Sequence, residues 1–204
     1  MLSTGPAAAP TLLLAHGAGA PMDSAFMEEI ARLLAERGAR TLRFEFAYMA
    51  TRRAEGAKRP PDRMPKLELA FRKAFAEAQS LAARQPLFIG GKSMGGRVAS
   101  HLVDDLGAAG LICLGYPFHP PGRPEKLRTE HLPDIQAPAL IVQGERDPFG
   151  KRDEVNGYTL SPSTKLVWTP DGDHDQKPRK ASGFTHAENL SAVADAVANF
   201  MGVA

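Results

Sequence analysis

The chain has 204 residues, of which 43% are hydrophobic and 24% are charged. This length allows one sizeable hydrophobic core and is too short to argue for two, so we expect a single domain over residues 1–204. The formal net charge of +2 and the pI of about 8.8 give no reason to expect nucleic acid as the main partner.

Short apolar runs rich in branched residues alternate along the chain with longer segments of helical period. This alternation is typical of a parallel sheet that is covered by helices on both faces. We predict strands at residues 11–15, 41–46, 86–91, 110–116, 139–144 and 164–169. The expected fold class is therefore α/β, a three-layer α/β/α sandwich with a mostly parallel six-stranded sheet.

Four segments place apolar side chains on one helical face. The first follows Asp23, which can act as its N-cap. The last begins after Thr185, which has the spacing of a capping box with Glu188. The other two helices are expected at residues 67–81 and 94–106.

Three connections, at residues 47–65, 117–137 and 170–185, are longer than the about 2–6 residues that are usual for βα and αβ loops. All three follow strands, so they should emerge at the carboxyl edge of the sheet, where ligands bind in open α/β folds. We expect the functional residues there.

The only cysteine, Cys113, lies in the apolar run "LICLGY", so no internal disulfide can form and a buried, reduced thiol is expected. The start "MLSTGPAAAP" lacks a positive region, and the following "TLLLA" is far shorter than the ~20 apolar residues of a membrane span. We expect no export signal, no membrane anchor and a cytoplasmic location.

The stretch "LFIGGKSMGGR", residues 87–97, has two interpretations. A phosphate-binding loop G-x-x-x-x-G-K-[ST] that ends at Ser93 would need a glycine where Pro86 stands, so that pattern fails. The same residues satisfy G-x-S-x-G between a strand and a helix, with Gly91 and Gly95 relieving the crowding of a sharp turn. The motif predicts that Ser93 is a nucleophile, the alternative being a glycine-rich turn with an incidental serine.

A serine nucleophile needs a base to take its proton and a carboxylate to orient that base. Asp147 follows the fifth predicted strand, and His174 lies in the loop after the sixth. The order Ser93, Asp147, His174 is the one expected for a hydrolase with a nucleophile elbow.

Other interpretations of these loops stay open. In one alternative, Asp147 caps the turn before Pro148 and has no catalytic role. In another, Glu145 serves as the acid in its place. The alternating acidic residues of "PDGDHDQK", residues 170–177, could indicate a cation site.

The loop "HGAGA", residues 16–20, directly follows the first predicted strand. Such a loop can direct a backbone N–H toward the nucleophile, and we predict an oxyanion hole formed by the N–H groups of Ala18 and Met94. We interpret His16 as structural rather than catalytic.

With the elbow, the "HGAG" loop, Asp147 and His174 in this order, the sequence resembles the α/β-hydrolase superfamily across almost its whole length. The segments "GKSMGGR" and "GYPFHPPGRPEKLRTEHL" are similar to a small, lidless group of predicted hydrolases related to dienelactone hydrolases and testis-expressed hydrolase-like proteins. The resemblance implies the strand order 2-1-3-4-5-6, without the family's first two strands. A dienelactone hydrolase would be expected to have a cysteine nucleophile, so Ser93 argues against that activity.

The segment after the fourth predicted strand has only about 20 residues, which suits a loop rather than a cap domain. We expect its residues Tyr116, Phe118 and His119 to line an open site. The loop at residues 47–66 carries an excess of positive charge that would favour an anionic substrate if it faces the site. Its basic residues are Arg52, Arg53, Lys58, Arg59, Arg63 and Lys66.

These features predict a serine hydrolase that cleaves a small ester, thioester or activated amide through an acyl-enzyme. It needs no metal or organic cofactor, and its partner is a small acyl substrate rather than nucleic acid or a membrane. The alternatives are a hydrolase-fold interaction protein with little turnover and an acyltransferase. The oligomeric state is open.

Overall fold

Seven strands form one sheet in the computed structural model of the chain, which describes residues 1–57 and 59–203. The strands are β1 (Leu2–Thr4), β2 (Thr11–Ala15), β3 (Arg40–Phe44), β4 (Leu87–Lys92), β5 (Leu111–Leu114), β6 (Ala139–Gly144) and β7 (Thr164–Thr169). Their spatial order is β1-β3-β2-β4-β5-β6-β7, and β2 to β7 run parallel. The expected order 2-1-3-4-5-6 is confirmed for the six parallel strands.

The prediction of six strands is wrong by one, because the chain starts with the short edge strand β1. Leu2 to Thr4 pair antiparallel with β3, in a register that places Leu2 opposite Arg43. None of the three residues is fully buried, so the segment carries no hydrophobic pattern and its strand conformation depends on pairing with β3.

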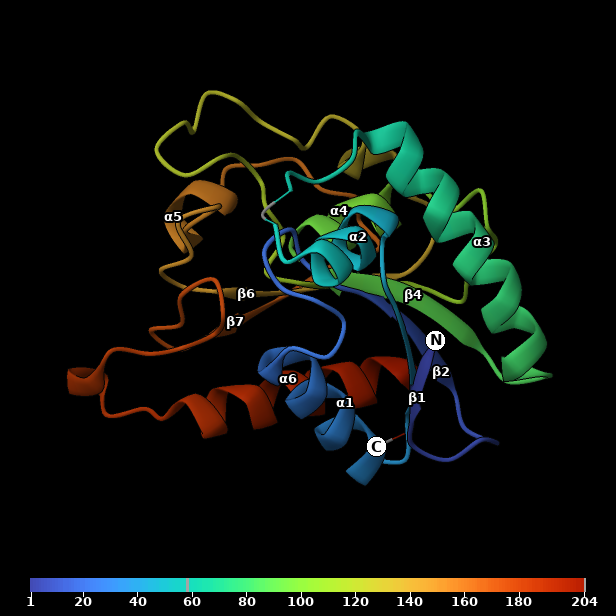
Figure 1. Ribbon diagram of the computed structural model, residues 1–204. Coiled ribbons are helices and arrows are strands. Elements are labelled where there is room, and N and C mark those ends of the chain that lie inside the picture. The colour runs from blue at the N-terminus through green and yellow to red at the C-terminus, as the bar shows by residue number, and fades with distance from the viewer. Residues whose placement is uncertain (58, 204) are drawn as a thin grey trace.

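Helices cover both faces of the sheet (Figure 1). They are α1 (Ala25–Glu36), α2 (Ala47–Glu55), α3 (Met64–Ala82), α4 (Met94–Ser100), α5 (Arg152–Val155) and α6 (His186–Met201). Helices α1 and α6 lie side by side on one face, and α3 and α4 pack on the other, so the predicted three-layer sandwich is confirmed.

The alternation of side chains along β2 shows how the strands serve two cores. Leu13 and Ala15 belong to the core under α3 and α4, whereas Leu12 and Leu14 belong to the core under α1 and α6. Cys113 lies in the first of these cores, fully buried, with its Sγ 3.6 Å from the carbonyl oxygen of Gly96. Burial raises the pKa of this thiol, which keeps it protonated.

The helix boundaries depart from the predictions in three places, one of which is α3, which begins at Met64 rather than at residue 67. Helix α1 begins after Ser24, because the Asp23 carboxylate is occupied by Arg53 at 2.6 Å instead of capping the helix. Helix α4 ends at Ser100, and the rest of the predicted segment 94–106 forms turns. The predicted capping box is confirmed, since the N–H of Glu188 donates to Thr185 Oγ1 at 3.2 Å.

The segment 47–65, predicted as a loop, contains the helix α2. Only Tyr48 and Met49 of this helix are buried, so its sequence is mostly polar and lacks a full apolar stripe. Lys58, counted in the basic loop, lies outside the described residues. The segment between β5 and β6 contains no cap domain within the described chain. None of the helices in residues 1–57 and 59–203 has the length and apolar content needed to cross a membrane.

Candidate active site

Ser93 occupies the sharp turn between β4 and α4. Its backbone has φ 50° and ψ −114°, a strained conformation for a residue with a side chain. A Cβ at Gly91 would lie 2.5 Å from the backbone carbon of Gly95, and one at Gly95 would lie 2.6 Å from the carbonyl oxygen of Ala15. Glycine is therefore required at both positions for β2 and α4 to approach this turn.

Asp147 and His174 form a hydrogen-bonded pair at the carboxyl edge of the sheet. The Asp147 side chain is fully buried, and its Oδ2 lies 2.8 Å from His174 Nδ1. Since an ionised carboxylate only accepts hydrogen bonds, Nδ1 carries the proton and Nε2 keeps a free lone pair. The neutral tautomer of His174 can therefore act as a base through Nε2.

Asp147 is held in place by two further donors. Gln143 Nε2 donates to Oδ2 at 2.9 Å, and the N–H of Phe149 donates to Oδ1 at 2.9 Å. The turn-capping interpretation is thus compatible with the catalytic one, because separate oxygens serve the two roles. Glu145, the alternative acid, is instead paired with Arg152 at 2.7 Å.

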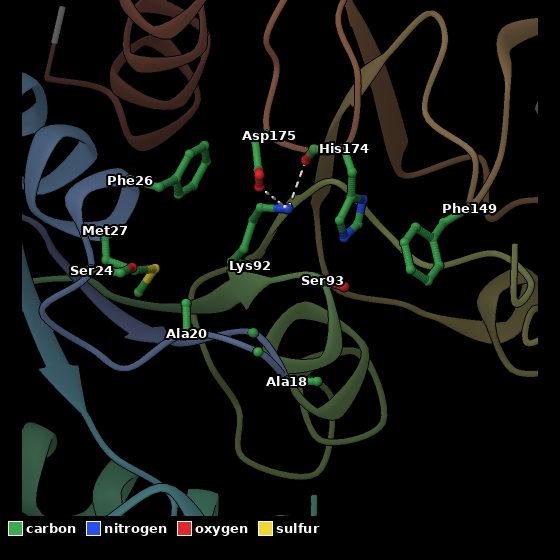
Figure 2. Close-up of a pocket in the computed structure, with 12 residues that line it drawn as sticks. Ala18, Ala20, Ser24, Phe26, Met27, Lys92, Ser93, Phe149, His174 and Asp175 are labelled. Carbon is green, nitrogen blue, oxygen red and sulfur yellow. Dashed lines mark hydrogen bonds and ion pairs between the residues drawn. The ribbon is translucent and has the colours of Figure 1, made fainter. Parts of the chain in front are cut away.

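Ser93 and His174 line one cavity of about 280 Å³, here called the His174 pocket. Figure 2 shows the Ser93 hydroxyl below the imidazole of His174 and the ring of Phe149 beside that imidazole, with the ring centroids 4.2 Å apart. The pocket is lined by Gly17, Ala18, Gly19, Ala20, Ser24, Phe26, Met27, Lys92, Ser93, Phe149, His174 and Asp175. The structure thus brings all three predicted triad residues together at one edge of the sheet.

Lys92, which the sequence analysis did not single out, fixes the backbone that carries His174. Its Nζ donates to the carbonyl oxygen of His174 at 2.7 Å and lies 3.2 Å from Asp175 Oδ1 (Figure 2). The Lys92 side chain is only 9% exposed, and burial lowers its pKa. A buried cation therefore links β4 to the loop that follows β7.

The acidic residues near His174 stabilise their own loop. Asp171 pairs with Arg146 at 2.9 Å and with Arg179 at 2.5 Å, and hydrogen bonding to Arg179 lowers its pKa to about 2. Asp173 accepts from the N–H groups of Asp175 and Lys177, each at 2.9 Å. These contacts account for the acidic pattern without a cation.

His16 holds the loop after β2 in place through its hydrogen bonds, in agreement with the predicted structural role. The N–H of Phe46 donates to His16 Nε2 at 3.1 Å, so the proton of the buried ring is on Nδ1, which donates to Gly17 O at 2.7 Å. Tyr48 on α2 donates to the carbonyl oxygen of Ala18 at 3.2 Å. Ala18, placed in this way, lines the cavity beside Ser93.

Tyr116, Phe118 and His119 do not line the site, contrary to expectation. All three are buried, and the Tyr116 hydroxyl donates to the carbonyl oxygen of Arg128 at 2.9 Å. Phe118 packs against Tyr116, and His119 Nε2 lies 3.4 Å from Glu154. These residues form the base of the loop after β5 instead of contacting a ligand.

Two of the three predicted anion-binding arginines are already paired with carboxylates. Arg53 pairs with Asp23 and Glu45, and Arg59 with Glu55 at 2.5 Å. Arg52 donates to the carbonyl oxygen of Gly19 at 3.3 Å. None of these three arginines lines the His174 pocket. The positive charges of Arg53 and Arg59 are therefore already compensated by carboxylates within the chain.

A second cavity, of about 340 Å³, also contains Ser93 and is here called the Arg97 pocket. It is lined by Ala18, Pro61, Asp62, Met64, Leu67, Ser93, Met94, Arg97, Pro117, Arg128 and Phe149. Both predicted oxyanion-hole residues, Ala18 and Met94, border it. Ser93 thus lines both pockets.

The chain belongs to the family whose model is described as an alpha/beta hydrolase domain, because that model matches residues 8–202. Solved structures with the same fold include an alpha-beta serine hydrolase homologue from Coxiella burnetii, at 17% identity and a TM-score of 0.73, covering 97% of this chain and 89% of the other.

Two bacterial structures are similar to the same extent. One is a serine hydrolase without lid from Xanthomonas campestris, at 21% identity, and the other is a dienelactone hydrolase from Anabaena variabilis, at 20% identity. Both have a TM-score of 0.73, and both matches cover 97% of this chain and 87% of the other. At these identities the likeness shows the common fold.

Proposed function

We propose that this protein is a serine hydrolase that cleaves small esters, thioesters or activated amides through an acyl-enzyme. The observation that carries the proposal is the hydrogen bond of 2.8 Å between Asp147 and His174, beside a serine held in a strained turn. A hydroxyl and an imidazole in one cavity, with a buried carboxylate that orients the imidazole from behind it, are what nucleophilic catalysis by serine requires.

In the first half-reaction, Ser93 Oγ attacks the substrate carbonyl carbon while His174 Nε2 takes the hydroxyl proton. The charge that develops on the carbonyl oxygen is stabilised by the N–H groups of Ala18 and Met94. His174 then protonates the leaving group, the bond to that group breaks, and the acyl group remains on Ser93. A water molecule repeats the sequence, releasing the acid and restoring the hydroxyl.

The two pockets divide the substrate between them. His174 must reach the leaving group to protonate it, and His174 lines only the first of the two cavities. The leaving group therefore occupies the His174 pocket, and the acyl chain enters the Arg97 pocket beside Met94. Since residues 1–57 and 59–203 form no cap domain over this edge, substrates of modest size have direct access.

Labelling with a fluorophosphonate followed by peptide mass spectrometry tests the proposal. We expect a phosphonate adduct on Ser93 that is absent from Ser93→Ala and strongly slowed in His174→Ala, with both variants folded. Folded wild-type protein without an adduct would contradict the proposal and favour an interaction protein. Acyl transfer to an added alcohol or amine in place of hydrolysis would identify an acyltransferase instead.

A further inference from the structure

Arg97 lies one helical turn after the proposed nucleophile. Its N–H donates to the carbonyl oxygen of Ser93 at 3.0 Å, so the helical geometry of α4 runs from Ser93 to Arg97. Residues four apart on a helix share a face. Both side chains accordingly line the Arg97 pocket.

Arg128 reaches the same pocket from the loop after β5. Its N–H donates to the carbonyl oxygen of Phe118 at 2.8 Å, and its own carbonyl oxygen accepts from the Tyr116 hydroxyl at 2.9 Å. Because Tyr116 and Phe118 are both fully buried, they fix the backbone of Arg128 on the core. The position of this arginine is thus built into the fold.

Neither guanidinium has a carboxylate within 4 Å among residues 1–57 and 59–203. The buried Nε of Arg97 has no hydrogen-bond partner in that part of the chain. Asp62, the one acidic residue lining this pocket, pairs with Lys66 at 2.8 Å. Burial and the nearby charge of Arg97 lower the pKa of Arg128. Arg97 and Arg128 thus place two positive charges in one pocket without a carboxylate partner among the described residues, an arrangement that suits an anionic ligand.

We propose that Arg97 and Arg128 together bind a carboxylate at the far end of the substrate's acyl group. This inference rests on the proposed function. The enzyme then prefers monoesters or monothioesters of dicarboxylic acids over esters of neutral acids. The guanidinium fork matches a carboxylate geometrically, and Met64, Leu67 and Phe149 supply apolar surface for the methylene chain between the two ends.

The preference is measured with two esters that share one leaving group, 4-nitrophenyl hydrogen adipate and 4-nitrophenyl hexanoate. The wild type should cleave the adipate with a kcat/KM on the order of tenfold higher or more, because hydrogen bonds to charged groups are the strong ones. In Arg97→Met and in Arg128→Met the ratio of the two kcat/KM values should fall on the order of tenfold. Arg97→Lys and Arg128→Lys should restore part of it.

Arg123→Met is the matched control, because Arg123 is an exposed arginine of the same loop and lines neither pocket that contains Ser93. Its ratio should equal that of the wild type. Circular dichroism checks that each variant folds. If Arg97→Met does not fold, Arg128→Met carries the test, since its contacts to the core are made by the backbone.

A binding measurement separates this inference from the proposed function. Calorimetric titration of Ser93→Ala with free adipate should show binding that is lost when Arg97→Met or Arg128→Met is added, whereas dimethyl adipate, which has no free carboxylate, should bind weakly in all of them. Arginine-dependent adipate binding without hydrolysis of any ester would support the subsite and overturn the proposed function. Hydrolysis of both esters at equal kcat/KM, unchanged by either substitution, would overturn the subsite alone.

Discussion

Replacing Lys92 by methionine should leave the free energy of unfolding nearly unchanged or raise it, and should lower activity by disturbing the position of His174. Lysine and methionine fill similar apolar space in the core, so the substitution removes mainly the charge and its hydrogen bonds. The lost contacts are the 2.7 Å bond to the carbonyl oxygen of His174 and the 3.2 Å ion pair with Asp175, which is itself exposed. The pair with Asp175 contributes little because solvent screens it.

The two energetic effects on stability oppose each other. A hydrogen bond from a charged group contributes about 1.5–3 kcal/mol, while burial of an ion costs several kcal/mol. Burial is the largest influence on Lys92 and lowers its pKa, so the partners do not offset the cost of burying the charge. We expect the free energy of unfolding of Lys92→Met to stay within about 1 kcal/mol of the wild type or to rise.

Activity should respond differently, because the backbone at His174 loses its anchor to β4. Displacement of a catalytic group by about 1 Å can cost on the order of 100-fold in rate, so we expect the rate of fluorophosphonate labelling of Ser93 to fall at least tenfold. The assays are urea denaturation and the rate of fluorophosphonate labelling of Ser93, with Lys177→Met as the control on an exposed lysine of the same loop. Folded Lys92→Met that is labelled at the wild-type rate would refute a positioning role for this lysine.

Four further substitutions test other parts of the structure. Asp147→Asn should keep the fold and slow labelling by a factor on the order of 10³–10⁴, because an amide can hold the wrong tautomer of the imidazole. Gly91→Ala should lower the free energy of unfolding by about 1–3 kcal/mol or more, because its Cβ would lie 2.5 Å from the backbone of Gly95. A Cβ added at Gly17 would lie 3.6 Å from its nearest neighbouring atom, which is an ordinary contact distance. Gly17→Ala should therefore unfold at nearly the same urea concentration as the wild type. Burial, more than nearby positive charge, lowers the pKa of His131 from 6.5 to about 4. As the pH falls, the imidazole of His131 is therefore protonated in the unfolded chain at a higher pH than in the folded protein. Stability should therefore be lost as the pH falls from 6.5 toward 4, and a His131→Gln variant with the same pH dependence would contradict this assignment.

Four of the parallel strands, β2, β4, β5 and β6, could be predicted from the sequence because each contains a continuous apolar run near turn residues. Strands β2 and β4 are buried at every position, as expected when both faces of a sheet are covered. Strand β1 could not be predicted, because three partly exposed residues have no periodicity and become a strand only through pairing with β3. The helix α2 was missed for a related reason, since only Tyr48 and Met49 contact the core.

The candidate catalytic residues could be located because strand ends converge at one edge of a parallel sheet. The direction of side chains within the long loops could not be predicted. Gly115, with φ 68°, turns the chain at the end of β5, and the aromatic residues that follow it are buried. Arg97 could have been recognised as a site residue from its spacing of four after Ser93 on a helix.

Because Cys113 is buried, thiol reagents can be directed to a cysteine introduced on the surface of the folded protein. As the chain has only this cysteine, and its Sγ lies in the core against Gly96, a maleimide should find no native target on the folded surface. A cysteine introduced at Arg123 would then carry a single fluorophore at the rim of the loop that positions Arg128. The arrival of a ligand beside Ser93 could be followed by emission from that dye, with the native core intact.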